Sequence, residues 1–349
     1  MGDIFLNALK QEWAISCKKY KLKGKSISTI YCGGGTPSIL TLKQWNTFYR
    51  EIIKRCNLSD NLEWTIECNP DSFSTEKAKL WIQSGVNRLI IGVQSVNNRE
   101  LKILGRSHSS EQALTILHNP VLTKFWSVGV DIMYGIPGQT YKSLYHTLKS
   151  ILNSSLINHI SAYELTFSEN TPFLRHKKII PLPSEREIVE MNELILSMVR
   201  EHGFEQYEIS NYSLPGFESS HNQAYWYHNP YIGLGPSAHS YIHPERFSNT
   251  RSMNTYLSRI LKGNTPESFS EIIDMEKMGY EMIFLRLRTK KGLNENEFFS
   301  KTGSYFNNPL REDVLNEFLQ KKHILYKSPY WRLSEKGILL ADAIIRKLI

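Results

Sequence analysis

The sequence has few cysteines, and none of them stand close together. The 349-residue chain contains only Cys17, Cys32, Cys56 and Cys68. Zinc and iron–sulfur sites are normally marked by close pairs such as Cys-x2-Cys, and this chain has no such pair. Cys17 and Cys56 fall in amphipathic helical patterns, which predicts that they are small core residues. A disulfide framework is not expected, because such frameworks are typical of small secreted domains.

Long hydrophobic runs and targeting signals are also missing. No apolar stretch reaches the roughly 18 residues that a membrane-spanning helix needs. The first residues, MGDIFLNALKQEW, have neither the basic region nor the apolar core of a secretory signal. We therefore expect a cytoplasmic protein. The formal net charge of +8 suits acidic partners, although the lysines are spread along the chain and form no basic block.

What the chain does have is a repeated pattern of strands and helices. Short runs dense in β-branched and aromatic residues predict strands at 27–32, 63–67, 88–93, 127–133 and 159–165. Helical patterns separate these runs, and several begin at capping residues: Thr41 with Gln44, Thr140, and Ser184 with Glu187. Repeated βα units fold into a parallel sheet, which is either doubly wound or curled into a barrel.

Polar residues distinguish these two architectures. Residues 33–36, Glu67, Gln94 and Asp131 lie at or near the carboxyl ends of different predicted strands. In a barrel these ends meet at one mouth, whereas a doubly wound sheet places its site at a single switch point. Successive strands that each contribute a polar group therefore favour the barrel.

After residue 166 the pattern changes. A proline-punctuated basic loop at 168–183 leads to a helix expected to begin after Ser184 and to end at Gly203. The segment 205–241 is rich in aromatic residues, histidine, glycine and proline, which is typical of a binding surface. A boundary near residue 265 precedes three helices, a hairpin and a final helix from Glu335, an order similar to a winged-helix module. We expect three parts, at 1–166, 167–265 and 266–349.

The stretch CGGGTPS after the first predicted strand indicates a ligand site. A tight turn explains one or two glycines, whereas three in a row indicate a ligand that lies against bare backbone. The stretch is not a Walker loop, which needs Lys-Ser/Thr after the glycines. It is not a Rossmann loop either, because Pro37 stands where the helix should continue.

Side chains at the other strand ends indicate what that ligand carries. Glu67 can pair with an ammonium group, and Arg106 can clamp a carboxylate. Asp131 is costly to bury in an apolar strand unless it has a partner. Each also has a structural alternative, as a solvated charge at the end of a strand or helix. Together they fit a zwitterionic amino acid with a hydroxylated appendage, such as S-adenosylmethionine.

Several longer motifs occur in a recognisable order: IYCGGGTPSIL, ECNPDSFS, GVNRLIIGVQSVN, LKILGRSHS, VDIMYGIPGQT and HISAYELT. In order and spacing they resemble the radical S-adenosylmethionine proteins related to oxygen-independent coproporphyrinogen III oxidase. The later EQYEISNYSLPGFESSHNQAYW and YIGLGPSAHSY resemble the heme-chaperone branch of that family. The resemblance covers essentially the whole chain.

The resemblance implies a fold and a set of ligands. The fold would be α/β, a partial (β/α)6 radical-SAM barrel lacking its first strand, then an irregular aromatic-rich segment and a small winged-helix-like α+β C-terminal domain. S-adenosylmethionine would be held by Gly34, Gly35, Thr36, Glu67, Gln94, Arg106 and Asp131. Heme would bind at His221, where Tyr225 and Trp226 can stack on a porphyrin. His228 and His239 are alternatives, and a purely structural role for His221 is the other interpretation.

The chain departs from that family in one respect. Its relatives carry Cys-x3-Cys-x2-Cys after their first strand, and these thiolates hold a [4Fe–4S] cluster. This sequence has no such motif, and five strands are visible where the fold expects six. A start point downstream of that segment explains both absences, and we favour it over true loss of the segment or a new cluster site formed by the remaining cysteines. The sequence therefore predicts no catalytic residue and no metal ligand in this chain, and a cluster only if an upstream segment supplies the cysteines.

These patterns are compatible with three functions. The favoured one is a heme chaperone that delivers heme to an acceptor; a respiratory-chain acceptor, peripheral membrane contact through it and a dimer are considered with it. The alternative is an oxidoreductase of the coproporphyrinogen oxidase type, which needs the absent cluster. Nucleic-acid binding through the C-terminal module is not expected, because basic positions such as Lys327 and Arg332 are sparse.

Overall fold

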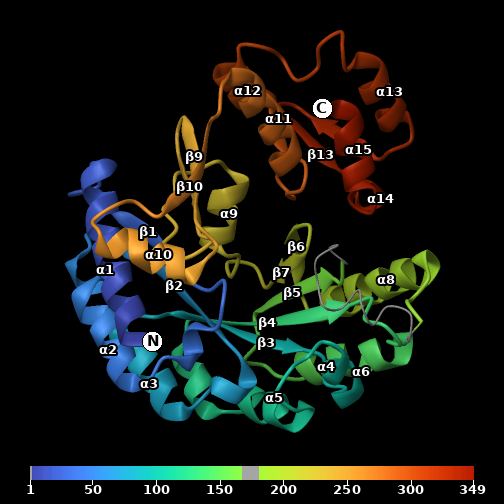
Figure 1. Ribbon diagram of the computed structural model, residues 1–349. Helices are drawn as coiled ribbons and strands as arrows, with labels where there is room; N and C mark the ends of the chain where they lie inside the picture. Colours follow the sequence, from blue (N-terminus) through green and yellow to red (C-terminus); the bar gives the residue numbers. More distant parts are fainter. Residues whose placement is uncertain (1, 167–180) are drawn as a thin grey trace. The chain divides into compact units, whose positions relative to one another are not determined.

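The computed structural model describes residues 2–166 and 181–349, which form two compact units (Figure 1). The sheet unit comprises Ser28–Leu42 and Asp60–Ser219. The composite unit comprises Met1–Ile27, Lys43–Ser59 and Ser220–Ile349. Most of the basic loop predicted at 168–183 lies outside the described residues. The division into three parts at 166 and 265 stays a prediction.

A curled seven-stranded sheet forms a half-barrel, in the order β1-β2-β3-β4-β5-β7-β6. Strands β2 to β5 pair in parallel, and β7 and β6 extend the sheet as antiparallel strands. The bounds are β1 (Ile27–Cys32), β2 (Leu58–Cys68), β3 (Arg88–Gln94), β4 (Ser127–Tyr134), β5 (His159–Glu164), β6 (Glu205–Glu208) and β7 (Asn211–Ser213). The expected α/β half-barrel is confirmed. The sequence pattern does not reveal β6 and β7, because each is too short to show a period.

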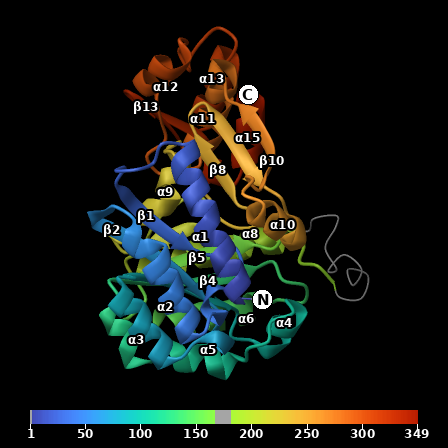
Figure 2. The same ribbon diagram turned by 60° about the vertical axis from the view of Figure 1, so that its left-hand side comes forward.

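Helices cover this sheet, and capping residues set where they begin. In both views α3, α5 and α6 lie along one side of the sheet (Figure 1, Figure 2). The predicted caps at Thr140 and Ser184 are confirmed, and Gly203 follows α8 with a φ of 81°. Every residue of β3 is buried, as expected for a strand covered on both faces. The helices are α3 (Thr75–Ser84), α4 (Asn98–Ile103), α5 (Ser110–Leu117), α6 (Tyr141–Leu152) and α8 (Glu185–Glu201).

The composite unit combines helices with two small sheets, ordered β10-β9-β8 and β11-β13-β12. Its last part has the expected order of three helices, a hairpin and closing helices. Its strands are β8 (His239–Ile242), β9 (Glu245–Asn249), β10 (Glu267–Ile272), β11 (Leu293–Asn294), β12 (Ile324–Lys327) and β13 (Tyr330–Leu333). Its helices are α1 (Gly2–Lys19), α2 (Leu42–Glu51), α9 (Ser220–Trp226), α10 (Met253–Leu261), α11 (Met275–Arg286), α12 (Glu295–Thr302), α13 (Glu312–Gln320), α14 (Glu335–Ile338) and α15 (Ala341–Leu348).

A buried carboxylate on α1 holds the composite unit together. Glu12 is only 2% exposed, and it accepts hydrogen bonds from Gly235 N at 2.8 Å, Tyr256 Oη at 2.6 Å and Asn249 Nδ2. Burial raises the pKa of Glu12, and the three hydrogen bonds act in the opposite direction. One side chain therefore joins α1 to the loop at 235, to β9 and to α10.

Replacing Glu12 with alanine should destabilise the protein strongly. The change leaves the buried donors on Gly235, Asn249 and Tyr256 without their acceptor, so the free energy of unfolding should fall by about 3 kcal/mol. Urea denaturation measures this loss. Lys10→Ala is the control, because its pair with Glu51 is exposed and should contribute less than about 1 kcal/mol. Equal losses for the two variants would contradict the assignment.

Candidate functional site

Two of the three glycines in the loop after β1 are required by local geometry, each for a different reason. A Cβ on Gly33 would come within 2.7 Å of the Glu67 carboxyl and would also strike the ring of Tyr31. Gly34 has a φ of 73°, which favours glycine. A Cβ on Gly35 would meet no atom within 4 Å, and Gly35 does not have a positive φ that would require glycine. The structure thus explains two glycines by local geometry and leaves Gly35 as bare backbone that a ligand can approach.

Glu67 lies near the end of β2 and is held by two donors. The hydroxyl of Tyr31 donates to Oε1 at 2.7 Å, and the amide of Gly34 donates to Oε2 at 3.3 Å. Burial raises the pKa of Glu67, while these two hydrogen bonds counteract part of that effect. The carboxylate is therefore oriented from β1 and from the glycine loop at once.

Asp131 lies in β4, with Ser161 opposite it on β5. Burial raises the pKa of Asp131 to about 7; a hydrogen bond with Ser161 lowers it, the charge of Glu67 raises it, and Arg106 lowers it. The charges of Glu67 and Arg106 thus both act on Asp131. The assignment of these three side chains to a particular ligand stays a prediction.

The side-chain amides of Gln94 and Asn69 lie beside Gly92, and Asn69 also contacts Thr36. Gln94 ends β3 with a φ of 63°, a conformation that is rare for residues other than glycine and that proteins tend to retain at functional sites. A Cβ on Gly92 would lie 3.1 Å from both Asn69 Oδ1 and Gln94 Nε2, so these amides flank it. Asn69 Nδ2 also donates to Thr36 Oγ1 at 3.4 Å.

The loop that carries Arg106 is fixed on both sides. Gly105 has a φ of 66°, and Arg106 N donates to Leu101 O at 2.9 Å. On the other side, Ser107 Oγ donates to Asp71, and His108 Nε2 lies 3.2 Å from Val93 O. Sequence reasoning missed four contributors to the site: Tyr31, Asn69, Asp71 and Ser161. Tyr31 could have been found from its place in the predicted strand immediately before the glycine run.

The cysteines do not form a cluster site among residues 2–166 and 181–349. No group of three His, Cys, Asp or Glu side chains there could hold a metal ion, and all four cysteines are free. Burial raises the pKa of Cys32 to about 11 and that of Cys68 to about 12, which disfavours the thiolates that iron needs. The described residues therefore do not fit a [4Fe–4S] cluster, and we derive no step from one.

His221 lies on α9, in the composite unit. Its Nε2 is 2.9 Å from Tyr225 Oη, and the two rings are T-shaped with centroids 4.9 Å apart. Burial raises the pKa of Tyr225 to about 12, and the ring of Tyr231 lies 4.5 Å from it. His239, one alternative candidate, is the exposed first residue of β8.

His228, the other alternative, is engaged in a buried network with α11. Its side chain is 4% exposed, and its Nε2 lies 2.9 Å from Glu281 Oε2. Arg246 on β9 donates to the same carboxylate. Arg286, also on α11, lies 4.1 Å from the ring centre of Tyr227. Of the histidines considered, His221 is thus the one that lies on the aromatic helix α9.

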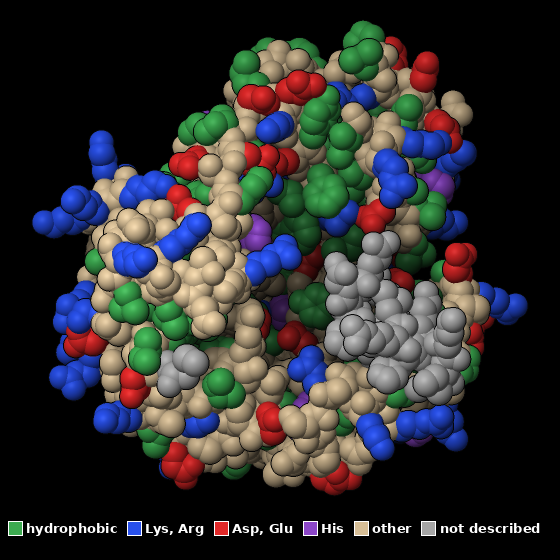
Figure 3. All heavy atoms as spheres, viewed as in Figure 1, with side chains coloured by type: hydrophobic (Ala, Val, Ile, Leu, Met, Phe, Trp, Pro, Cys, Tyr) green, Lys and Arg blue, Asp and Glu red, His purple; other side chains and the backbone are tan. Residues whose placement is uncertain are grey.

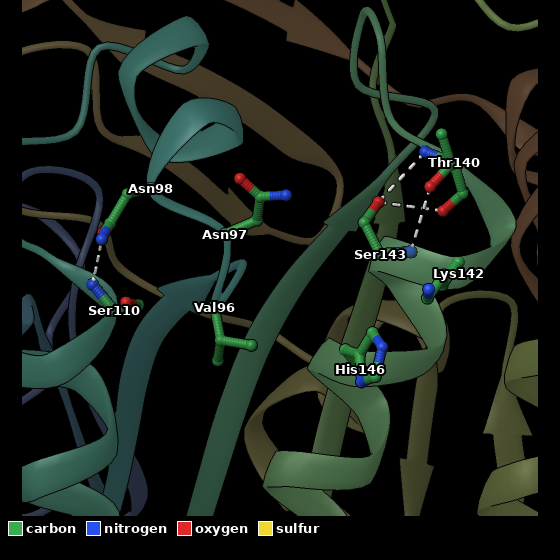
Figure 4. Close-up of a pocket in the computed structure, with 8 residues that line it drawn as sticks. All are labelled: Val96, Asn97, Asn98, Ser110, Thr140, Lys142, Ser143 and His146. Carbon is green, nitrogen blue, oxygen red and sulfur yellow. Dashed lines mark hydrogen bonds between the residues drawn. The ribbon is translucent and has the colours of Figure 1, made fainter.

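A pocket opens at the first turns of α4, α5 and α6 and contains none of the predicted site residues (Figure 4). Amides at its edge already have acceptors, because Ser110 N donates to Asn98 at 2.8 Å and Ser143 N donates to Thr140 at 3.1 Å. Helix capping explains this arrangement, and we assign no ligand to it. Its lining comprises Val96, Asn97, Asn98, Ser110, Thr140, Lys142, Ser143 and His146.

Comparison with known proteins places these features in a family. The model of the Radical SAM superfamily matches residues 10–151. Heme chaperone HemW of Bacillus subtilis is 33% identical over 98% of this chain and 90% of its own length, and HemW of Lactococcus lactis is 30% identical over 99% and 89%. A solved structure of coproporphyrinogen III oxidase (HemN) from Escherichia coli aligns with a TM-score of 0.84 at 20% identity, covering 99% of this chain and 83% of that one.

The half-barrel is that of a radical SAM protein. Within that class, the chain belongs to the HemW family.

The environment of Asp131 leads to a prediction about pH. The carboxyl has a pKa of about 7 in the folded chain and an ordinary value near 4 when unfolded, so between these values the folded state binds the proton more tightly. Stability therefore falls as pH rises through this window, and Asp131→Asn removes that loss. The thermal midpoint of Asp131→Asn, measured by calorimetry, should exceed that of the wild type at about pH 8 and approach it towards about pH 5.

Asp60→Asn serves as the control, because Asp60 is exposed. Its difference from the wild type should be the same at both pH values. A difference for Asp131→Asn that does not widen with pH would contradict the prediction.

Proposed function

We propose that this protein is a heme chaperone, which binds heme and S-adenosylmethionine and delivers the heme to an acceptor protein. The observation that carries the proposal is the similarity to HemW over nearly the whole chain. The motif HNQAYW adds chemical support, because one short helix bears an imidazole together with aromatic rings.

The strand-end site suits S-adenosylmethionine. Gly35 offers open backbone, and Glu67 is an oriented acid. Arg106 carries a guanidinium on a loop whose backbone is held by Leu101, and Asp131 and Gln94 offer polar groups for hydroxyls. In the radical SAM family this molecule supplies radical chemistry together with a cluster. Here we propose only that these residues, with Gly34 and Thr36, bind and orient it.

Heme would bind at His221 as cargo. The Nε2 atom is a common iron ligand, and Tyr225 and Trp226 bring ring faces suited to a porphyrin. To reach iron through Nε2, His221 must exchange its hydrogen bond with Tyr225 for the metal. The net charge of +8 suits the propionates of heme.

Two other functions receive less support. Similarity to HemN at 20% identity concerns the fold alone, and an oxidase would need cluster ligands that the described residues lack. For nucleic-acid binding a basic stripe would be expected, but Lys and Arg side chains are scattered over the visible face among acidic ones (Figure 3).

Location and partners complete the proposal. No helix among the described residues is long and apolar enough to cross a membrane. We propose a cytoplasmic location, with a heme-accepting protein of the respiratory chain as the partner and membrane contact made through it. A dimer is part of the same proposal.

Heme titration tests the cargo site. The wild type should show a saturable Soret band, and His221→Ala should weaken binding at least about tenfold, because loss of an axial ligand costs more than about 1.4 kcal/mol. His239→Ala is the matched control in the same segment and should bind heme as the wild type does. Absence of saturable binding by the wild type, or equal binding by His221→Ala, would contradict the proposal.

Isothermal titration with S-adenosylmethionine tests the strand-end site. Arg106→Ala should weaken binding by about tenfold, because it removes a charge-assisted contact to the carboxylate of the ligand. Arg99→Ala is the control, since Arg99 is exposed on the neighbouring helix α4. Similar affinities for both variants would argue against this role of Arg106.

A further inference from the structure

Tyr31 makes a short hydrogen bond to Glu67, a predicted ligand-binding side chain. Its hydroxyl donates to Glu67 Oε1 at 2.7 Å, while Gly34 N reaches Oε2 only at 3.3 Å. The hydroxyl is therefore the stronger of the two restraints on the carboxylate. Both restraints come from the strand and loop that carry the glycine run, so Glu67 of β2 is oriented by its neighbour β1.

Gly33 makes this contact possible. Any Cβ at position 33 would overlap the ring of Tyr31 and the carboxyl of Glu67. The absence of a side chain there is explained by the meeting of these two residues, and not by a ligand. Tyr31 lies in β1 and Gly33 follows the last residue of that strand, so the ring and the gap that it needs are encoded two residues apart.

The surroundings of Tyr31 keep its hydroxyl protonated, so that it can donate a hydrogen bond to Glu67. Burial, followed by the charges of Glu67 and Asp131, raises the pKa of Tyr31 far above its usual value. The phenol therefore stays protonated at neutral pH. A neutral donor beside a buried carboxylate favours the ionised form of that carboxylate, which counteracts the effect of burial on Glu67.

We infer that Tyr31 is a positioning residue for the amino-acid end of S-adenosylmethionine: it holds the Glu67 carboxylate ionised and directed at the α-ammonium group of the ligand. This inference rests on the proposed function. It assigns to Tyr31 no contact with the ligand, so its effect must pass entirely through Glu67.

The test compares two ligands that share a nucleoside. S-adenosylhomocysteine carries the amino-acid end, whereas 5′-methylthioadenosine lacks it. Tyr31→Phe removes only the hydroxyl, and it should weaken S-adenosylhomocysteine binding about tenfold, the effect of losing a hydrogen bond to a charged group. Binding of 5′-methylthioadenosine should change by less than about twofold. Isothermal titration measures both.

Two further variants separate positioning from a general loss of structure. Tyr134→Phe also removes a tyrosine hydroxyl with a side-chain partner, Asn192, and should leave both affinities unchanged. In a Glu67→Gln background, Tyr31→Phe should have almost no additional effect, because the carboxylate on which it acts is gone.

The outcomes are distinct. If the wild type binds neither ligand, the S-adenosylmethionine site of the proposed function fails, and this inference fails with it. If the wild type binds both, the inference alone is overturned by any of three results: equal weakening of both ligands by Tyr31→Phe, no weakening, or a full effect of Tyr31→Phe in the Glu67→Gln background.

Discussion

The candidate site of the sheet unit is built around two partly buried carboxylates, Glu67 and Asp131, on neighbouring parts of the sheet. Burial raises the pKa of both Glu67 and Asp131, and the charge of Glu67 raises that of Asp131 further. Such a concentration of acid is unfavourable for folding and is retained where a ligand later compensates for it. The hydrogen bonds from Tyr31 to Glu67 and between Ser161 and Asp131, together with the charge of Arg106, are the means by which the fold tolerates this arrangement.

Much of the sheet could be predicted from the sequence, because buried parallel strands leave dense apolar runs and the helices between them begin at capping residues. β3 and β4 illustrate this, since both were visible within a residue of their ends. β6 and β7 could not be predicted in the same way. They have only four and three residues, and their pairing with β5 depends on contacts distant in sequence.

The candidate site was predictable only in part. Charged and amide residues at strand ends are conspicuous, so Glu67, Gln94 and Asp131 could be proposed from position alone. The purpose of each glycine was not predictable, because it depends on which atoms come close in three dimensions. Gly33 makes room for Tyr31, whereas a Cβ on Gly35 would meet no atom within 4 Å. The choice of His221 over His228 as the heme ligand likewise required the structure, because the partner of His228, Glu281, lies far along the chain.

Helix α11 bears two of those distant partners. Glu281 accepts from both His228 and Arg246, and Arg286 covers the ring of Tyr227. The turn after α9 and the first of the C-terminal helices, α11, are thus held together by these contacts. A chimera that exchanged the last eighty or so residues with those of a relative would separate acid from imidazole. A crossover between α9 and α11 would therefore separate these partners, whereas one after α11 would leave them in the sequence of one parent.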